Sequence, residues 1–437
     1  MNQQPNILVI YTDQQSASMM SCTGNAYLQT PAMDYLAAQG IRFNRAYCTN
    51  PVCIPSRFSL LTGRYPSEIG LKSNKVEQEI DHVPQEIKDS GLGWLLKDAG
   101  YDVAYGGKEH LPLMCTEDLG YQYITDDERE GLADTCAAFI KKKRKKPFFL
   151  TVSFINPHDI CMMAIRDYPT CELDHVLVKV CKKEQAMLDD VLKKVDSYEK
   201  DNFWRDICPP LPDNFEPQAH EPEAISMLLK QRPFKEKARK HYTQEQWRLH
   251  RFAYCRLTER VDAHIHMLLQ ALQESGQEDN TVIIFTSDHG DMDGSHRMEH
   301  KTALYEECCR IPLIITHQGQ CIQNHIDDEH LVSNGLDLYP TICDYAGITI
   351  PKNIQGNSLK PIVEGADPIW RNRLIVESEF GKMNVTKKYK HVQYIQGAHS
   401  EQLYDLVKDP GEMENIATDE TYSDMLKAFR KSKPTIE

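Results

Sequence analysis

The 437-residue sequence lacks the features that mark membrane proteins, disulfide scaffolds and repeat proteins. No apolar run is long enough to cross a bilayer, and the N-terminal run Ile7–Tyr11 is also too short for a signal peptide. None of the 14 cysteines forms a Cys-x-x-Cys pair, and there is no internal repeat or low-complexity segment. We therefore expect a soluble globular protein whose cysteines are mostly reduced, located in the cytoplasm, or in the periplasm or outside the cell if a signal was removed ahead of this numbering.

The sequence also lacks an excess of positive charge, since its formal net charge is −14. A chain of this charge has no general attraction for nucleic acids or anionic membranes, so we expect neither as a partner. The basic run Lys141–Lys146 is typical of a solvated helix end ahead of a strand. An anionic substrate is still compatible with this charge, because local basic side chains or a metal can reverse the field inside a cleft.

Three apolar runs rich in β-branched residues each lead into polar residues. Asn6–Tyr11, Phe148–Ile155 and Thr281–Thr286 have the length and composition of strands buried on both faces of a parallel sheet. Helical patterns alternate with them: Thr30–Gly40 has a Thr cap, a first-turn Pro and a closing Gly, and Thr243–Gly276 has one apolar face. The alternation predicts an α/β fold with a large doubly wound, mostly parallel sheet flanked by helices, and a site at the carboxyl ends of the strands.

The pattern changes in two later segments. Cys208–Pro222 carries five prolines, which predicts an irregular excursion that lines the substrate cleft. After about residue 365, short strands separated by turn residues predict a small C-terminal α+β subdomain with an antiparallel sheet. These strands are expected at Leu374–Glu377, Tyr389–Ile395 and Gln402–Asp405. We expect a catalytic domain over residues 1–365 and the C-terminal subdomain over residues 366–437.

Cys53–Arg64 combines residue types that favour anion chemistry. Pro55 favours a helix that starts just after Cys53, which places Cys53 at a helix N-terminus, where free N–H groups and the helix dipole favour negative charge. Arg57 lies one helical turn further on the same face. A nucleophile, a dipole and a guanidinium thus converge on one anion-sized position. By itself, a Cys-x-Pro-x-Arg pattern more often belongs to a buried cysteine and an arginine in a surface salt bridge.

The longer match resembles the signature of the type I, formylglycine-dependent sulfatases of the alkaline-phosphatase-like superfamily. Cys53-x-Pro-Ser-Arg57 is followed by Leu61-Thr62-Gly63-Arg64, the pattern recognised by the enzyme that oxidises the cysteine to formylglycine. Further blocks resemble the same family in order: Asn6–Gln14, Thr30–Cys48, Gly100–Leu111, Thr286–Gly290, Lys301–Glu307, Arg310–Ile315 and Gln402–Ala417. The resemblance covers most of the chain and implies a sulfuric ester hydrolase.

The resemblance also implies a metal site. In the family, the positions of Asp13, Gln14, Asp288 and His289 bind one calcium ion together with the formylglycine, here derived from Cys53. Carboxylate and amide oxygens suit Ca²⁺, whereas His is less typical, so another divalent ion stays open. Gln14 replaces the commoner second Asp, which lowers the negative charge around the ion and is expected to weaken its binding.

The remaining site residues are likewise implied by the resemblance. Lys108 and His110 match the family's Lys-x-His pair, and Lys301 matches the lysine near the leaving oxygen. His158 matches a histidine beside the sulfate, although the proline that many relatives carry two residues later is absent. His296 is a candidate for substrate contact, with an ordinary loop histidine as an equal alternative.

The implied chemistry is attack on sulfur by the metal-bound formylglycine hydrate, through a covalent sulfo-enzyme intermediate. Arg57, Lys108 and His158 would neutralise the sulfate oxygens. Lys301 or His158 would protonate the leaving alcohol, and His110 would take the proton of the second hydroxyl. The implied partners are a formylglycine-generating or sulfatase-maturing enzyme and a sulfated small molecule or glycan. A sulfated carbohydrate is the first expectation, and an aryl or alkyl sulfate is the second.

Three alternatives stay open on the sequence. A phosphonate monoester or phosphodiester hydrolase of the same superfamily can use the same nucleophile and metal ligands, because sulfuryl and phosphoryl centres share a tetrahedral shape. An alkaline-phosphatase-type enzyme with two zinc ions fits less well, since Cys53 stands where that enzyme has Ser or Thr. A non-catalytic binding protein would leave Cys53 unoxidised and would not need Lys108, His110 and Lys301 together.

Overall fold

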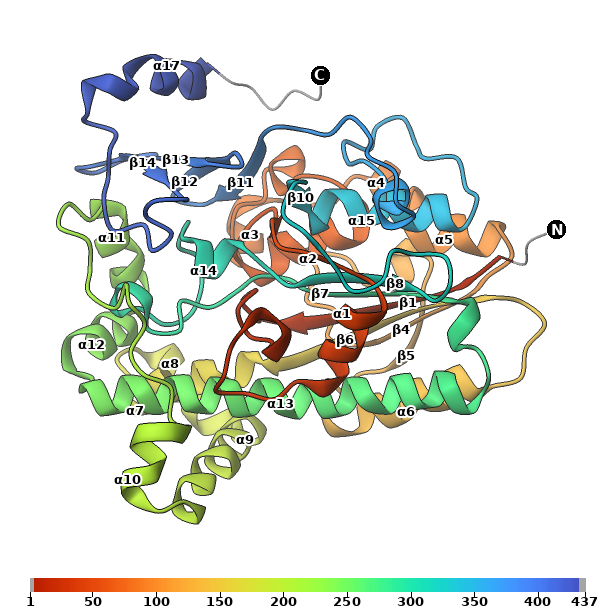
Figure 1. The fold of residues 1–437 in the computed structure, drawn as a ribbon, viewed down its shortest axis with the longest axis horizontal. Helices are drawn as coiled ribbons and strands as arrows, with labels where there is room; N and C mark the ends of the chain where they lie inside the picture. Colours follow the sequence, from red (N-terminus) through yellow and green to blue (C-terminus); the bar gives the residue numbers. More distant parts are fainter. Residues whose placement is uncertain (1–3, 432–437) are drawn as a thin grey trace.

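An eight-stranded sheet forms the centre of the computed structural model, which describes residues 4–431 (Figure 1). In order across the sheet, the strands are β5 (Gln122–Thr125), β4 (Asp102–Gly107), β6 (Phe148–Pro157), β1 (Asn6–Asp13), β7 (Thr281–Ser287), β8 (Leu313–His317), β2 (Ile41–Phe43) and β9 (His325–Asp327). The first five are parallel to one another, and β8 is antiparallel to both of its neighbours. The predicted mostly parallel sheet is therefore confirmed.

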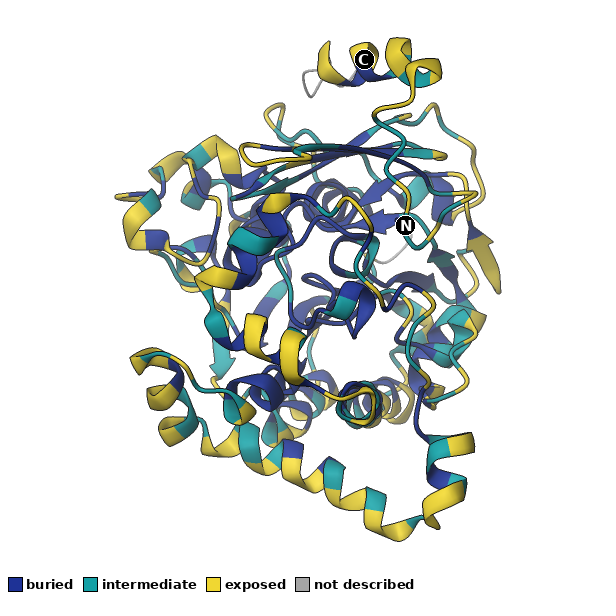
Figure 2. Ribbon diagram, turned by 90° about the vertical axis from the view of Figure 1, so that its left-hand side faces the viewer, coloured by how far each residue is buried: buried dark blue, intermediate teal, exposed yellow. Residues whose placement is uncertain are grey.

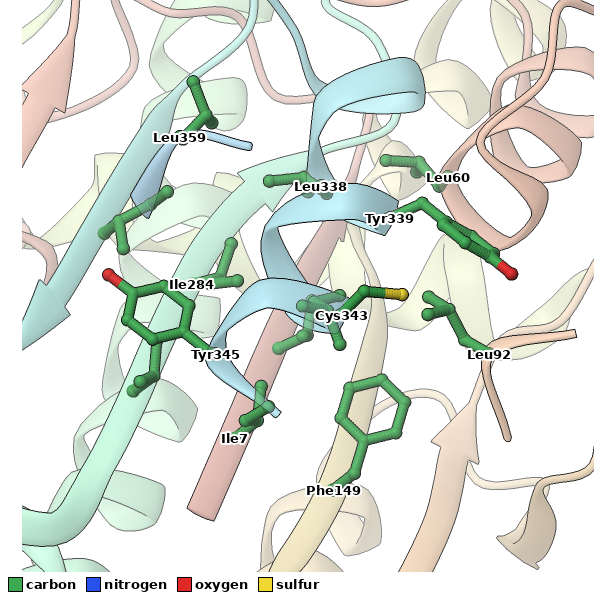
Figure 3. Packing of buried hydrophobic residues seen from close by; sticks show 14 of the residues in the cluster. Ile7, Leu60, Leu92, Phe149, Ile284, Leu338, Tyr339, Cys343, Tyr345 and Leu359 are labelled. Carbon is green, nitrogen blue, oxygen red and sulfur yellow. The ribbon is translucent and has the colours of Figure 1, made fainter. Parts of the chain in front are cut away.

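Helices cover both faces of this sheet, as the apolar centre of β1 requires, and β1 is buried throughout. Ile7 and Val9 point to one face and Leu8 and Ile10 to the other. The first face carries α2 (Cys53–Thr62), α5 (Leu92–Asp98) and α15 (Asn334–Tyr345), and the second carries α1 (Pro31–Gln39), α6 (Glu130–Lys141) and α13 (Gln244–Glu274). Figure 3 shows Leu338 of α15 lying over the strands on the first face. The doubly wound arrangement is confirmed.

The chain between β6 and β7 is a long, mainly helical insertion. Its helices are α7 (Cys161–Asp167), α8 (Glu172–Val180), α9 (Lys182–Lys193), α10 (Lys200–Asn202), α11 (Glu223–Gln231), α12 (Pro233–His241) and α13, which runs along one face of the sheet (Figure 1). The proline-rich stretch Cys208–Pro222 contains no helix or strand, as expected from its sequence. Exposed residues lie on the outer faces of these helices, while the central sheet is buried (Figure 2).

A second, four-stranded antiparallel sheet follows near the C-terminus, as predicted. It consists of β11 (Leu374–Ser378), β12 (Gly381–Val385), β13 (Tyr389–Tyr394) and β14 (Glu401–Asp405). The sequence did not predict β12, in which Lys382 and Asn384 alternate with apolar residues and Asn384 is nevertheless buried. The sheet packs in one apolar cluster with α11 and α14 (Glu306–Cys309). The boundary at residue 365 stays a prediction.

The remaining strands and α-helices of the described residues are short. They are β3 (Ala46–Tyr47) and β10 (Val332–Ser333), which pair with each other, and the helices α3 (Val76–Glu79), α4 (Gln85–Asp89), α16 (Lys360–Val363) and α17 (Ser423–Lys431). No helix among residues 4–431 has the length and apolarity needed to cross a membrane. All 14 cysteines are free thiols, which agrees with the expectation that they are mostly reduced.

The start of α1 differs from the sequence prediction. The Thr30 side chain does not cap the helix. Instead, the carboxylate of Asp262 in α13 accepts hydrogen bonds from the backbone N–H groups of Ala32 at 3.1 Å and Met33 at 2.9 Å. A carboxylate satisfies these free N–H groups and also interacts favourably with the helix dipole. The predicted Thr cap was therefore wrong, because a residue 230 positions away supplies the cap.

We expect Asp262→Ala to lower the free energy of unfolding by about 1–3 kcal/mol, because it leaves two buried N–H groups without acceptors. Urea denaturation followed by circular dichroism measures the change. Asp134→Ala, on the exposed face of α6, is the matched control and should change stability little. Equal stability of the two variants would show that Asp262 does not hold α1.

Candidate active site

Polar residues from four separate segments meet at the carboxyl edge of the central sheet. Asp13 ends β1, Lys108 follows β4, and Asp288 and His289 follow β7. Cys53 reaches the same edge as the first residue of α2. Because parallel strands end at one edge, residues far apart in sequence become neighbours there. One ligand atom from each of Asp13, Cys53, Asp288 and His289 lies within 4.8 Å of the others, and all four side chains are buried.

Arg57 holds the two carboxylates of this cluster together. Its Nη2 donates to Asp13 Oδ2 at 3.0 Å and its Nε donates to Asp288 Oδ2 at 2.9 Å. Its Nη1 donates to the Lys108 carbonyl at 2.9 Å and to Ser153 Oγ at 2.7 Å. Most of the guanidinium donors are therefore committed to protein groups, which favours a positioning role. Contact of Arg57 with a sulfate stays a prediction.

The remaining carboxylate oxygens face inward. Asp13 Oδ1 lies 3.9 Å from Cys53 Sγ and 4.0 Å from His289 Nε2, and Asp288 Oδ1 lies 3.6 Å from His289 Nε2. The imidazole is oriented by its other nitrogen, since Nδ1 is 2.9 Å from the Gly290 carbonyl. Two carboxylates, an imidazole and residue 53 around one point are a donor set that fits a divalent cation.

The electrostatics of the two carboxylates differ. Burial alone would raise the pKa of Asp13, but the positive charges of Lys108, Lys301 and Arg57 outweigh it and hold that pKa well below its usual value. Burial, followed by the negative charge of Asp13, raises the pKa of Asp288. A cation beside both carboxylates would relieve their repulsion and favour the ionised form of each.

Cys53 lies in the most positive part of the cluster. Lys301 Nζ donates to its Sγ at 2.9 Å, and His289 Nε2 lies 3.2 Å from the same atom. Burial and the charge of Asp13 would raise the pKa of the Cys53 thiol, but Lys301, Lys108 and His289 lower it well below its usual value. The predicted place of Cys53 at a helix N-terminus is confirmed. The positive charge beside it comes from Lys301 and Lys108, and the predicted convergence of the Arg57 guanidinium on the same anion position stays a prediction.

Lys108 and His158 border the same cluster. Lys108 Nζ pairs with Asp13 Oδ2 at 2.5 Å and is 6% exposed. Desolvation, followed by the positive charge of Lys301, lowers the pKa of His158 well below its usual value, so that its imidazole is neutral. A neutral imidazole can exchange a hydrogen bond or a proton but supplies no fixed charge to a sulfate.

Three further residues singled out from the sequence have other surroundings. The Gln14 amide donates to Asp291 Oδ2 at 2.5 Å and accepts from Cys161 Sγ at 3.2 Å. His110 is exposed two residues after Lys108. His296 is fully buried and stacks on Tyr305, with ring centroids 4.1 Å apart. The roles proposed for these three residues stay predictions.

Sequence reasoning missed two groups that support the site. Ser153 lies within the apolar run of β6 and accepts from Arg57, so its only signal was a hydroxyl in a buried strand. Asp291 lies three residues after Asp288 in the loop that follows β7 and accepts from the Gln14 amide, and burial raises its pKa to about 7. Neither residue stands out in the sequence, because each acts through a partner from a distant segment.

The chain is similar to sulfatases along nearly its whole length. The family model "Sulfatase" matches residues 5–348, and the model "N-sulphoglucosamine sulphohydrolase, C-terminal" matches residues 294–435. The chain is 28% identical to a Delta 4,5-hexuronate-2-O-sulfatase of Bacteroides thetaiotaomicron, over 98% of this chain and 88% of the relative.

Two solved structures share the fold. A 2-O GAG sulfatase superposes with a TM-score of 0.82 at 26% identity, over 98% of this chain and 90% of the other. A phosphonate monoester hydrolase of Agrobacterium radiobacter superposes with a TM-score of 0.74 at 20% identity, over 98% of this chain and 94% of the other. The latter similarity concerns the fold alone, so the architecture by itself does not choose between sulfuryl and phosphoryl substrates.

We expect a divalent cation to stabilise the folded protein through Asp288. Adding Ca²⁺ to chelator-treated wild-type protein should raise its Tm, because an ion that binds only the folded state shifts the unfolding equilibrium. Asp288→Asn should lose most of this increase, whereas Asp134→Asn should keep it. An unchanged wild-type Tm, together with full activity in excess chelator, would show that the protein neither binds nor needs a divalent cation.

Proposed function

Because the chain belongs to the sulfatase family, we propose that it hydrolyses a sulfate ester of a carbohydrate with formylglycine, formed from Cys53, as the nucleophilic residue. The proposal includes one divalent ion, which we take to be Ca²⁺ from the two carboxylates of the donor set. The observation that carries it is the placement of Cys53 Sγ, buried at the start of α2 and within 3.2 Å of both Lys301 Nζ and His289 Nε2.

A thiol in this position does not suit sulfate transfer, since its adduct has no second hydroxyl with which to expel sulfate. Formylglycine hydrate has two hydroxyls, so one can form a covalent sulfo-enzyme intermediate and the other can drive its breakdown. A cation held by Asp13, Asp288 and His289 would lower the pKa of an oxygen on residue 53 and stabilise negative charge there. Arg57 binds the outer oxygen of each carboxylate. The inner oxygen of Asp288 accepts from the backbone N–H groups of Gln14 at 3.0 Å and His289 at 2.8 Å, which fix its direction and leave a carboxylate lone pair for a cation.

The basic side chains around residue 53 have separate roles: some donate or accept protons, and others neutralise negative charge. Burial would lower the pKa of Lys301, but the charges of the Cys53 thiolate, in the unoxidised protein, and of Asp13 raise it above its usual value. The charge of Asp13 remains after oxidation of Cys53 and favours the protonated form of Lys301. Lys301 is therefore a better donor to the leaving oxygen than His158, whose pKa is lowered. Lys108, ion-paired with Asp13, lies where it can neutralise sulfate oxygens. His110 is assigned the proton of the second hydroxyl.

A carbohydrate substrate is supported by the named relatives. The Delta 4,5-hexuronate-2-O-sulfatase and the 2-O GAG sulfatase both carry names of sulfated-sugar enzymes, and both align along nearly the whole chain. The metal cluster and Cys53 would serve any sulfate ester, so the choice of leaving group rests with the segments around the cluster, including the insertion between β6 and β7.

We expect wild-type protein, produced together with a formylglycine-generating enzyme, to release sulfate from an O-sulfated sugar and from an aryl sulfate faster than it cleaves an aryl phosphonate ester. Cys53→Ala should lower sulfate release by at least about 10³-fold, because it removes the nucleophile. Cys115→Ala, at a partly exposed thiol outside the site, should keep wild-type activity. A faster phosphonate reaction would instead assign the chain to phosphonate hydrolysis, and unchanged activity of Cys53→Ala would exclude the proposed nucleophile.

A further inference from the structure

One buried lysine near the site has no anionic partner. Among residues 4–431, three lysines are buried: Lys108, Lys235 and Lys390. Lys108 pairs with Asp13, and Lys390 pairs with Glu412 at 2.7 Å and with Glu306 at 3.3 Å. Lys235 is 7% exposed, and no carboxylate of the described residues forms an ion pair with it. A buried ammonium without a partner is costly, so its retention calls for an anion that binds there.

Lys235 belongs to α12, in the insertion between β6 and β7, and it lies close enough to Lys301 and His300 for the charges to influence one another. The preceding Phe234 packs on the ring of His300, with centroids 5.1 Å apart, and His300 is followed directly by Lys301. The helix α12 also contacts α7, which begins at Cys161 beside the Gln14 amide. Lys235 thus lies between two segments that border the Cys53 cluster.

The surroundings of Lys235 are positive or neutral. Burial lowers its pKa to about 8, and the positive charges of Lys301 and Arg232 act in the same direction. The thiols of Cys161 and Cys308 have raised pKa values, so they are uncharged. Arg232, three residues earlier in the chain, pairs with Asp174 at 3.1 Å. The ammonium of Lys235 can therefore bind an anionic group that comes from outside the protein.

We propose that Lys235 binds a second anionic group of the substrate, one that stays on the sugar when the sulfate leaves. This inference rests on the proposed function, because it assigns a specificity residue to the same reaction. The group is a carboxylate, as in a uronic acid, or a second sulfate, since both are compact oxyanions that a buried ammonium binds with hydrogen bonds. Lys235 determines which substrate binds. It takes no part in breaking the ester bond, for which Lys301 donates the proton.

The test compares kcat/KM of the formylglycine-containing enzyme on four classes of substrate: O-sulfated uronic acids, disulfated glucosamines, O-sulfated N-acetylglucosamine and para-nitrophenyl sulfate. Wild-type protein should prefer one of the two doubly anionic classes, and which of the two it prefers identifies the second group. Lys235→Gln should lower the ratio of kcat/KM between that class and para-nitrophenyl sulfate by about 10- to 100-fold, mainly through KM.

Two further variants make the result specific. Lys237→Gln, on the exposed face of the same helix, should keep the wild-type ratio. Lys235→Arg retains the charge and should recover part of the preference, which a purely structural role would not predict. An unchanged ratio in soluble, folded Lys235→Gln, or a wild-type preference for the sugar with a single anionic group, would overturn the proposal while leaving the sulfatase reaction intact. A wild-type protein that releases sulfate from none of the four would instead overturn the proposed function, and this inference with it.

Discussion

The bridge that Arg57 makes between Asp13 and Asp288 is the constraint on which the site depends. Two buried carboxylates can approach one point only if positive charge offsets their repulsion, and Arg57 binds the outer oxygen of each. Because Arg57 lies one turn after Cys53 in α2, the same helix supplies the reactive residue and the brace for its metal ligands. The spacing of the Cys-x-Pro-Ser-Arg segment therefore also sets the distance between the proposed nucleophile and the two carboxylates beside it.

The fold separates chemistry from substrate choice. The carboxyl edge of the parallel sheet supplies Asp13, Lys108, Asp288 and His289 from β1, β4 and β7, and each is fixed by strands buried on both faces. The helical insertion between β6 and β7 is free to differ without disturbing this edge, and it brings Lys235 beside the segment that carries Lys301. A common sulfate-cleaving centre can thus be combined with a particular leaving group.

The features that could be predicted from the sequence are those that depend on short segments of the chain. Apolar runs predicted the strands, and the resemblance to the sulfatases, carried by the Cys53–Arg64 segment and the residues at the end of β1 and after β7, implied the cluster of Asp13, Cys53, Asp288 and His289. The features that were predicted wrongly or missed depend on residues far away in the sequence. Asp262 caps α1 in place of Thr30, and Asn384 is buried in a strand that its polar residues did not predict. Nothing in the sequence distinguishes Lys235 from the other lysines of α12, because its burial depends on the fold. The cytoplasmic location stays a prediction.

The chemical state of residue 53 is the property that everything above requires. Peptide mass spectrometry of catalytically active protein, digested to release the segment around Pro55, measures it directly. The account predicts a peptide lightened by the loss of the Cys53 sulfur and its replacement by an aldehyde oxygen, in proportion to the specific activity of each preparation. An intact thiol at position 53 in fully active protein would contradict it.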